Sequence, residues 1–376
     1  MCCKSINKLR ILQIFSQKTQ KHDKLAHYLL QSQTNPFSKS SMEIVLNTYG
    51  TSLSCENEAF VVRNCNGTQR IPTDGVTAIL INKGASVTSD AVMLAVDRQI
   101  QIHFVDRKGM PVGLVWSYKY GSVSTIRKNQ IDFCNSQQGF LWMKSIIQRK
   151  IENEQAMLYM VDIESVSVKR GRDDAIVKLD NYLSRLHAID AGNVQEVARE
   201  LRGVEGIAAN IYFKAMNLVL PEQYRTEERS QHPAMDVTNA LLNYGYGILY
   251  GKVEAALIRA GLDPYLGVLH RDDYNRPALA FDFIEVFRVW VDYVVYTLLA
   301  QRAVTADYYS IADNGACWLE PLGRRVMIQS LNDYLDEVID CKWGQRSRET
   351  IIFLTAQSLA QQIKAFNVID NNSSQS

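Results

Sequence analysis

The sequence predicts an α+β protein, in which a small N-terminal β-rich domain is followed by a larger all-α domain. Between residue 42 and about residue 120, short apolar runs alternate with turn-forming residues, as in a series of strands. Beyond residue 130, apolar residues recur every three or four positions, as in helices. A chain of 376 residues is long enough for two domains that each bury a core.

Composition narrows the class of protein. A hydrophobic content of 47% and a charged content of 22% are those of a soluble globular protein. The formal net charge is only +1, so a site for a polyanion has to be a local basic patch. Seven cysteines without a CxxC pair indicate reduced thiols and therefore a cytoplasmic protein. No apolar run reaches the roughly 18 residues that span a bilayer, so we expect no membrane segment. No apolar segment with a small-residue cleavage site follows the basic residues Lys4, Lys8 and Arg10, so we expect no signal peptide.

The β-rich domain is expected at 42–121. Residues 1–41 are expected to form a disordered extension, because the part after Gln17 is rich in Gln, Ser, Lys and His and offers little to bury. Asn66-Gly67 is the strongest short signal for a hairpin turn. A helix is expected to begin between Ser86 and Ser89. Strands are expected at 43–49, 60–63, 76–81, 100–105 and 112–118.

The helical domain is expected at 131–366, after a polar linker at 122–130. Gly261 and Pro264 form a typical helix stop, with glycine past the end and proline following. The tail at 367–376, which ends in Asn, Ser and Gln, is expected to be disordered. Helices are expected at 137–160, 173–190, 193–202, 204–217, 237–261, 281–301, 321–340 and 347–365.

One stretch of the helical domain carries a histidine and two carboxylates. His270 precedes a loop that contains Pro277, and Asp282 and Glu285 follow at a spacing that places both on one face of a helix. The surrounding residues are apolar, and burying carboxylates without partners costs several kcal/mol. Either they are paired locally and His270 is a satisfied core histidine, or all three side chains hold a cation. From this stretch alone, the two interpretations are about equally supported.

Two further helical segments carry candidate residues that are ambiguous by themselves. Glu205 lies between Gly203 and Gly206, whose small size lets a ligand or another helix approach closely; a glutamate near a helix N-terminus is the more common explanation. Asn239 and Tyr246 lie on a glycine-containing helix and could bind a phosphate or orient a site, although core packing is the more common role of such residues.

Basic residues could contact phosphates at several points of the chain. Each group is also explained as a solvated face, which is the more common role of a charge run. The groups are Arg127 with Lys128; Lys169, Arg170 and Arg172; Arg324 with Arg325; and Arg346 with Arg348.

Glu205, His270, Asp282 and Glu285 together have the composition of a site for a hard cation. Carboxylates with one imidazole suit Mg²⁺ or Mn²⁺, whereas a structural zinc site would contain more Cys or His. A divalent ion held in this way can polarise a phosphoryl oxygen and activate a hydroxyl nucleophile.

Four motifs in this order resemble the CRISPR-associated spacer-acquisition integrases, also called CRISPR-associated endonuclease one. The resemblance runs from Met42 to about Lys364. The motifs are Arg202-Gly203-Val204-Glu205-Gly206 with Ala208; Asn239-Ala240-Leu241-Leu242 with Tyr246-Gly247; the run from Gly261-Leu262-Asp263-Pro264 to Leu269-His270; and Asp282-Phe283-Ile284-Glu285-Val286-Phe287-Arg288.

The resemblance implies roles for the residues of these motifs. Glu205, His270 and Glu285 would bind the metal, and Asp282 would be a second acidic catalytic residue beside them. Asn239, Tyr246 and Arg288 would support the site or contact DNA. Backbone binding would fall to the local basic residues Arg127, Lys128, Lys169, Arg170 and Arg172.

The resemblance also implies an activity and partners. The helical domain would be catalytic, and with Mg²⁺ or Mn²⁺ it would insert short foreign DNA, the prespacer, into a CRISPR repeat by strand transfer from 3′-hydroxyl ends. The chain would form a homodimer through the β-rich domain and assemble with a small second spacer-acquisition protein. A non-catalytic DNA-binding scaffold is the alternative, since the net charge is near zero. A metallohydrolase of small phosphoesters is a third candidate.

Overall fold

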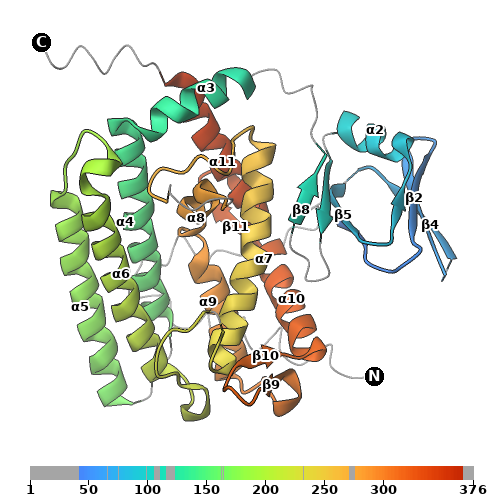
Figure 1. Cartoon of the computed structure of the whole chain (residues 1–376). Helices are drawn as coiled ribbons and strands as arrows, with labels where there is room; N and C mark the ends of the chain where they lie inside the picture. The colour runs from blue at the N-terminus through green and yellow to red at the C-terminus, as the bar shows by residue number, and fades with distance from the viewer. Residues whose placement is uncertain are drawn as a thin grey trace, which may run out of the picture.

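The computed structural model describes residues 42–366, apart from 66, 75, 99, 106–110, 116–122, 162, 164, 232 and 271–275. The predicted extension at 1–41 and tail at 367–376 lie outside these residues. The predicted fold class is confirmed: a β-rich part stands beside a larger, mainly helical part (Figure 1). In the described part of the chain, no helix combines the length and the apolar character needed to cross a membrane.

The β-rich part contains two four-stranded sheets. In the first, the pairs β1–β5 and β5–β7 are parallel and β7–β8 is antiparallel. The second is antiparallel except for its short β2–β6 pair. In spatial order, the first sheet is β1 (Met42–Leu46), β5 (Val76–Asn82), β7 (Gln101–Val105) and β8 (Pro111–Leu114), and the second is β4 (Gly67–Pro72), β3 (Ala59–Asn64), β2 (Ser52–Glu56) and β6 (Ser86–Val87).

Local sequence signals explain how this part folds. The predicted hairpin joins β3 to β4, with Asn64 opposite Gly67. The predicted helix is α2 (Ser89–Asp97), whose first turn is capped by the Thr88 side chain accepting from the Ala91 backbone N–H. Its buried Ala91 and Ala95 join a core that includes Phe60 of the second sheet.

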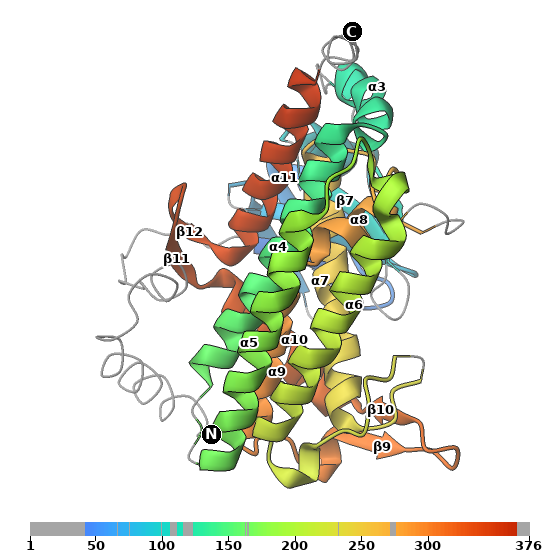
Figure 2. The same ribbon diagram turned by 90° about the vertical axis from the view of Figure 1, so that its left-hand side faces the viewer.

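Nine α-helices make up most of the rest of the described chain. Helices α4, α5 and α6 pack side by side, and α7 packs against α8, α9, α10 and α11 (Figures 1 and 2). The helices are α3 (Val123–Cys134), α4 (Gln137–Met160), α5 (Val166–Ala188), α6 (Val194–Val219), α7 (Val237–Arg259), α8 (Ala278–Ile284), α9 (Arg288–Ala300), α10 (Pro321–Asp336) and α11 (Arg348–Ala365).

The helical part also contains short elements that the sequence did not predict. They are two antiparallel hairpins, and 3₁₀ helices at Glu222–Tyr224 and Ala306–Tyr308. The hairpins lie before α10 and between α10 and α11, where their strands are three or four residues long and too short to give a clear alternating pattern. Their strands are β9 (Tyr309–Ile311) with β10 (Cys317–Leu319), and β11 (Val338–Cys341) with β12 (Gly344–Ser347).

The polar linker predicted at 122–130 is also wrong, because most of it belongs to α3. Its polar residues bond to other parts of the domain. Asn129 donates to the carbonyls of Ile363 and Phe366 at the end of α11, at 3.0 and 2.8 Å. Ile126 is buried, and Gln130 is fully buried. A polar residue of this segment therefore caps the end of another helix, and the segment is not a solvent-exposed linker.

Two predicted helix boundaries also differ from the structure. The segments 193–202 and 204–217 form one helix, α6, because Leu201, Val204 and Ala208 continue one buried face across Gly203. The segment 281–301 instead divides into α8 and α9, and the turn between them carries Glu285. Packing thus outweighs the roughly 1 kcal/mol helix penalty of a glycine.

Gln130 ties α3 to the loop that leads toward His270. Its amide N–H donates to the carbonyls of Asp263 and Leu266 at 2.8 and 3.2 Å, and its oxygen accepts from the Asp263 backbone N–H at 3.0 Å. We expect Gln130→Ala to lower the free energy of unfolding by about 1–3 kcal/mol, since it leaves buried backbone groups unpaired. Urea denaturation measures the change, with exposed Lys128→Ala as control. Equal stability of the two variants would contradict this role.

Candidate active site

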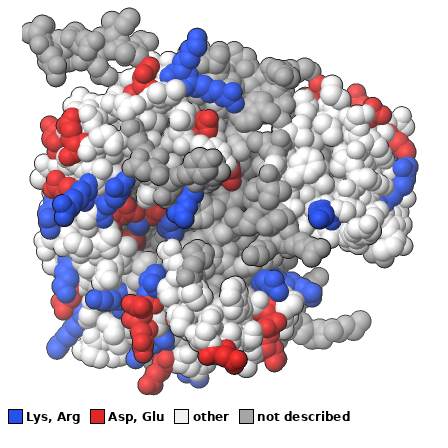
Figure 3. Space-filling view, viewed as in Figure 1, with Lys and Arg blue, Asp and Glu red and all other residues white. Residues whose placement is uncertain are grey.

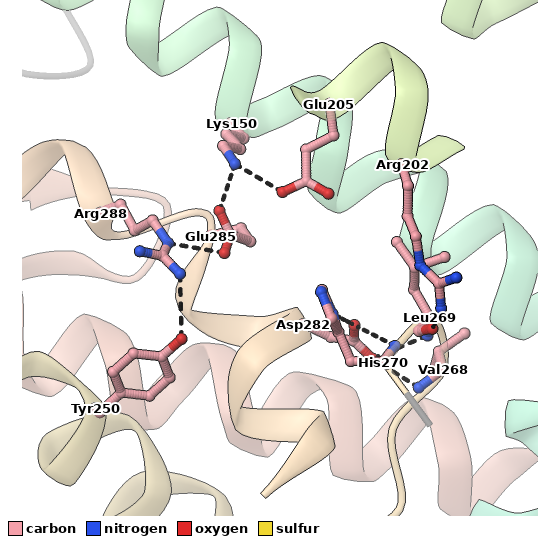
Figure 4. A network of polar contacts seen from close by, with 10 residues as sticks. All are labelled: Lys150, Arg202, Glu205, Tyr250, Val268, Leu269, His270, Asp282, Glu285 and Arg288. Carbon is pink, nitrogen blue, oxygen red and sulfur yellow. Dashed lines mark hydrogen bonds and ion pairs between the residues drawn. The ribbon is translucent and has the colours of Figure 1, made fainter. Parts of the chain in front are cut away.

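A buried lysine joins the carboxylates of Glu205 and Glu285. Lys150 Nζ lies 2.7 Å from Glu205 Oε1 and 2.6 Å from Glu285 Oε2. The three side chains come from α4, α6 and the end of α8, and are only 11%, 13% and 5% exposed. In Figure 4 both carboxylates are directed at the ammonium group. The structure therefore brings together two predicted ligands that are 80 residues apart in sequence.

Arg288 pairs with the other oxygen of Glu285. Its Nε donates to Glu285 Oε1 at 2.7 Å, and Nη2 donates to the Tyr250 hydroxyl at 3.1 Å. Burial alone would raise the pKa of Glu285, but Lys150 and Arg288 outweigh burial and hold that pKa at about 2. Glu285 is therefore ionised at neutral pH, as a cation ligand must be.

Asp282 organises the backbone that carries His270. Its carboxylate is fully buried and accepts hydrogen bonds from the backbone N–H groups of Val268, Leu269 and His270, at 2.6, 3.1 and 3.2 Å. Arg202 on α6 donates to the Leu269 carbonyl at 2.8 Å from the other side (Figure 4). The histidine is thus fixed by its own loop and by α6.

The same carboxylate holds the His270 ring. Asp282 Oδ1 lies 2.7 Å from His270 Nδ1, and this hydrogen bond raises the pKa of His270, with burial acting in the opposite direction. With Nδ1 directed at Asp282, Nε2 is the ring nitrogen left to bind a cation or a proton. Metal-binding histidines usually have such a carboxylate behind them.

A second buried polar cluster surrounds Asp292 on α9. Its carboxylate accepts from the Tyr212 hydroxyl at 3.0 Å and from the Tyr246 hydroxyl. The guanidinium groups of Arg288 and Arg229 lie over the Tyr246 ring, at 4.8 and 5.6 Å from its centre. Burial raises the pKa of Asp292 to about 6, although both tyrosine hydrogen bonds act to lower it. Through the Tyr246 ring, this cluster packs against the Arg288 guanidinium group and restricts its position.

The four predicted site residues divide into two groups. Glu205 and Glu285 share Lys150, whereas His270 is paired with Asp282. The groups are close enough that both glutamates contribute to raising the pKa of His270. Among the described residues, however, no three His, Cys, Asp or Glu side chains are already arranged as a ligand set. The Asp282 carboxylate is committed to its loop, so it orients His270.

The predicted DNA-contacting residues occupy different environments. Asn239 and Tyr246 are 1% and 5% exposed, and Asn239 accepts from Arg229 at 2.8 Å, so their burial favours a supporting role over direct contact. Arg288 is partly buried beside Glu285. Arg127 and Lys128 are exposed on α3; Lys169 and Arg170 are exposed in the first turn of α5, and Arg172 bonds to Asp173 at 2.6 Å.

Sequence reasoning missed Lys150 and also Glu154 on the same helix. Glu154 is 5% exposed, and burial raises its pKa to about 8. Lys150 lies next to buried Ile151 and three residues after buried Ile147. Helical spacing therefore places the lysine on the apolar face of α4, which is the signal that could have identified it.

A helical domain with a buried acidic cluster beside an oriented histidine defines a candidate catalytic protein. The family model described as CRISPR associated protein Cas1 matches residues 44–333. The chain therefore belongs to the Cas1 family, which confirms the resemblance seen in its four motifs.

Curated relatives match over most of their length. The chain is 30% identical over 330 residues to the CRISPR-associated endonuclease Cas1 1 of Archaeoglobus fulgidus, a match that covers 85% of this chain and 95% of the relative. It is 32% identical over 268 residues to the CRISPR-associated endonuclease Cas1 3 of Thermus thermophilus, covering 67% and 75% of the two proteins.

Solved structures share the fold. A CAS1 protein from Thermotoga maritima superposes with a TM-score of 0.67 at 20% identity, covering 87% of this chain and 98% of that one. A casposase bound to an integration product superposes with a TM-score of 0.61 at 20% identity, covering 86% and 95%. At these identities, the likeness concerns the fold alone.

Asp292→Asn is expected to remove a dependence of stability on pH. The folded protein keeps the Asp292 proton up to about pH 6, whereas the unfolded chain releases it near pH 4. The stabilising contribution of this group is thus fully present below pH 4 and is lost as pH rises to 6. Over that range, the unfolding free energy of the wild type should fall by about 3 kcal/mol relative to the variant. Urea denaturation at several pH values measures this; a constant difference would contradict it.

Proposed function

We propose that this chain is a metal-dependent DNA endonuclease and integrase, which inserts short foreign DNA into a CRISPR array by strand transfer from 3′-hydroxyl ends. One observation carries the proposal. Glu205 and Glu285 converge on the Lys150 ammonium group, at 2.7 and 2.6 Å, next to a histidine that Asp282 orients. The names of the curated endonuclease relatives support the same reaction class, as does the fold shared with a casposase bound to an integration product.

The donor set fits Mg²⁺ or Mn²⁺. Glu205, Glu285 and His270 Nε2 would hold the ion, because two carboxylates that converge on the Lys150 ammonium group present the hard oxygen donors that these ions prefer. A bound ion would supply Lewis acidity, which polarises the phosphoryl oxygen and stabilises charge on the leaving 3′-oxygen.

The remaining residues bind and position. Asp282 keeps the His270 ring directed at the site through Nδ1, and Arg288 holds Glu285 ionised. A Cβ built on Gly203 or Gly206 would meet nothing within 4 Å, so a DNA backbone has room to approach α6 beside Glu205. Basic residues on α3 and α5 would contact phosphates outside the site. On the face in Figure 3, Lys and Arg alternate with Asp and Glu, so these contacts would be local.

We also propose that the chain works as a homodimer and assembles with a small second acquisition protein. The β-rich part stands to one side of the helical domain in Figure 1, which leaves it accessible to a second copy. The structure of a Cas6-RT-Cas1–Cas2 complex superposes on 89% of this chain with a TM-score of 0.67, at 21% identity; the match covers 36% of that longer chain. This shared fold supports the proposed assembly.

A non-catalytic DNA-binding scaffold is the second candidate. One observation favours it: Lys150 and Arg288 already neutralise the two glutamates, as in a purely structural ion-pair cluster. A structural cluster, however, has no need of a partly exposed histidine held by a buried carboxylate. Activity of a variant that lacks only this histidine separates the two candidates.

His270→Ala should reduce cleavage and strand transfer by about 100-fold or more, since losing even an outer partner of a metal ligand typically costs 10–100-fold. The assay follows a labelled 3′-hydroxyl DNA joined to repeat DNA in Mn²⁺ or Mg²⁺. His187→Ala, which removes an exposed histidine at the end of α5, is the control. Full activity of His270→Ala, or no wild-type joining in either metal, would favour the scaffold.

Gly206→Ala should separate stability from DNA binding. Alanine stabilises a helix interior by about 0.5–1 kcal/mol relative to glycine, and its Cβ would meet no atom within 4 Å. We therefore expect a higher melting temperature together with weaker DNA binding, because the methyl group would narrow the open space over this part of α6. Calorimetry and fluorescence anisotropy measure the two effects. Unchanged DNA affinity would mean that the backbone does not pass over Gly206.

A further inference from the structure

Lys150 holds the position between two carboxylates that a divalent cation would need. Its ammonium group lies 2.7 Å from Glu205 Oε1 and 2.6 Å from Glu285 Oε2. Because both oxygens contact the same nitrogen atom, the distance between them cannot exceed the sum of these two contact distances. Glu205 and Glu285 would also hold a divalent cation, and the ion would need the carboxylate oxygens that the ammonium group now contacts. The lysine and the ion cannot hold both oxygens at once.

Lys150 is built into the core and is not a surface side chain folded into the site. It is 11% exposed and flanks the buried residues Ile147 and Ile151 on α4. Burying an ammonium group is costly unless opposite charges surround it. Glu205 and Glu285 supply those charges, and the lysine in turn offsets the repulsion between them.

Glu154 offers the lysine a second acceptor one turn along α4. Residues four apart share a helix face, so another rotamer of the flexible lysine side chain can bring its ammonium group to Glu154. Glu154 is 5% exposed, and within the described part of the chain its Oε2 has no hydrogen-bond partner. A buried acceptor without a partner costs stability. Such a group is explained if a second arrangement of the site gives it a donor.

We propose that Lys150 and a divalent cation compete for Glu205 and Glu285, and that Glu154 accepts the Lys150 ammonium when the cation binds. The inference rests on the proposed function, because it takes the same two glutamates as metal ligands. Lys150 and Glu154 are then positioning residues. The lysine keeps the carboxylates together before the cation enters, and Glu154 keeps the displaced charge paired inside the core.

The first test is the affinity of the full-length protein for Mn²⁺, measured from the electron paramagnetic resonance signal of the free ion. We expect Lys150→Met to bind Mn²⁺ about tenfold more tightly than the wild type, because the competing charge is gone. Lys150→Arg keeps a charge and should bind no more tightly than the wild type. Lys252→Met is the matched control, since Lys252 pairs with Glu349 at 3.1 Å outside the site. Equal or weaker binding by Lys150→Met would overturn the competition.

The second test does not depend on Lys150→Met folding with two unpaired carboxylates. Glu154→Gln keeps the shape of the side chain and leaves the proposed ligands in place. We expect it to bind Mn²⁺ about tenfold more weakly than the wild type, because the glutamine amide keeps an acceptor oxygen but lacks the negative charge that would pair with the displaced ammonium. The two substitutions should therefore change the affinity in opposite directions. Wild-type affinity of Glu154→Gln would overturn the role of Glu154.

His270→Ala distinguishes failure of this inference from failure of the proposed function. If the wild type binds Mn²⁺ more tightly than His270→Ala, the metal site stands and the Lys150 and Glu154 variants decide the competition. If His270→Ala binds as tightly as the wild type, or if neither the wild type nor Lys150→Met binds Mn²⁺, the metal site fails and the competition fails with it.

Discussion

The helical domain depends on compensating two carboxylates that lie inside it. Glu205 and Glu285 are 13% and 5% exposed, and an unpaired charge at that depth costs several kcal/mol. Lys150 on α4 therefore pairs with both carboxylates, and Arg288 pairs with the second oxygen of Glu285. These pairs require α4, α6 and the α8–α9 turn to meet at one point. The apolar packing of the helices and the charge pairing thus specify the same arrangement.

Asp282 imposes the second constraint. Its buried carboxylate satisfies three consecutive backbone N–H groups that have no helix or sheet to pair them, and it binds the His270 ring as well. The carboxylates of Asp282 and Glu285 therefore have different roles, although they are only three residues apart. Asp282 faces back into the loop and positions the histidine, whereas Glu285, at the turn after α8, faces Lys150 and α6.

The sequence predicts most where a periodic pattern is long. The helix expected at 137–160 is observed at those bounds, and the expected hairpin joins β3 to β4, because local signals determine both. Prediction from the sequence fails where distant contacts determine the local structure. The polar composition of α3 predicted a linker, but Asn129 of this helix bonds to the end of α11. Packing likewise continues α6 through Gly203. At the site, motifs predicted Glu205, His270 and Glu285 as ligands, and the structure brings Glu205 and Glu285 together at Lys150. The role of Lys150 depends on two residues 55 and 135 positions away, which spacing cannot reveal.

If a divalent cation and DNA bind at this cluster as proposed, its charges should couple the two binding events. Glu205 and Glu285 carry two negative charges, and Lys150 and Arg288 carry two positive ones, so the four groups are neutral together. A divalent cation added to them leaves a surplus of positive charge in a poorly solvated place, where Coulomb interactions are strong. A phosphate of the DNA backbone carries the opposite charge and can offset this surplus. The cation should therefore bind more tightly with DNA than without it, and by thermodynamic linkage the DNA should bind more tightly with the cation.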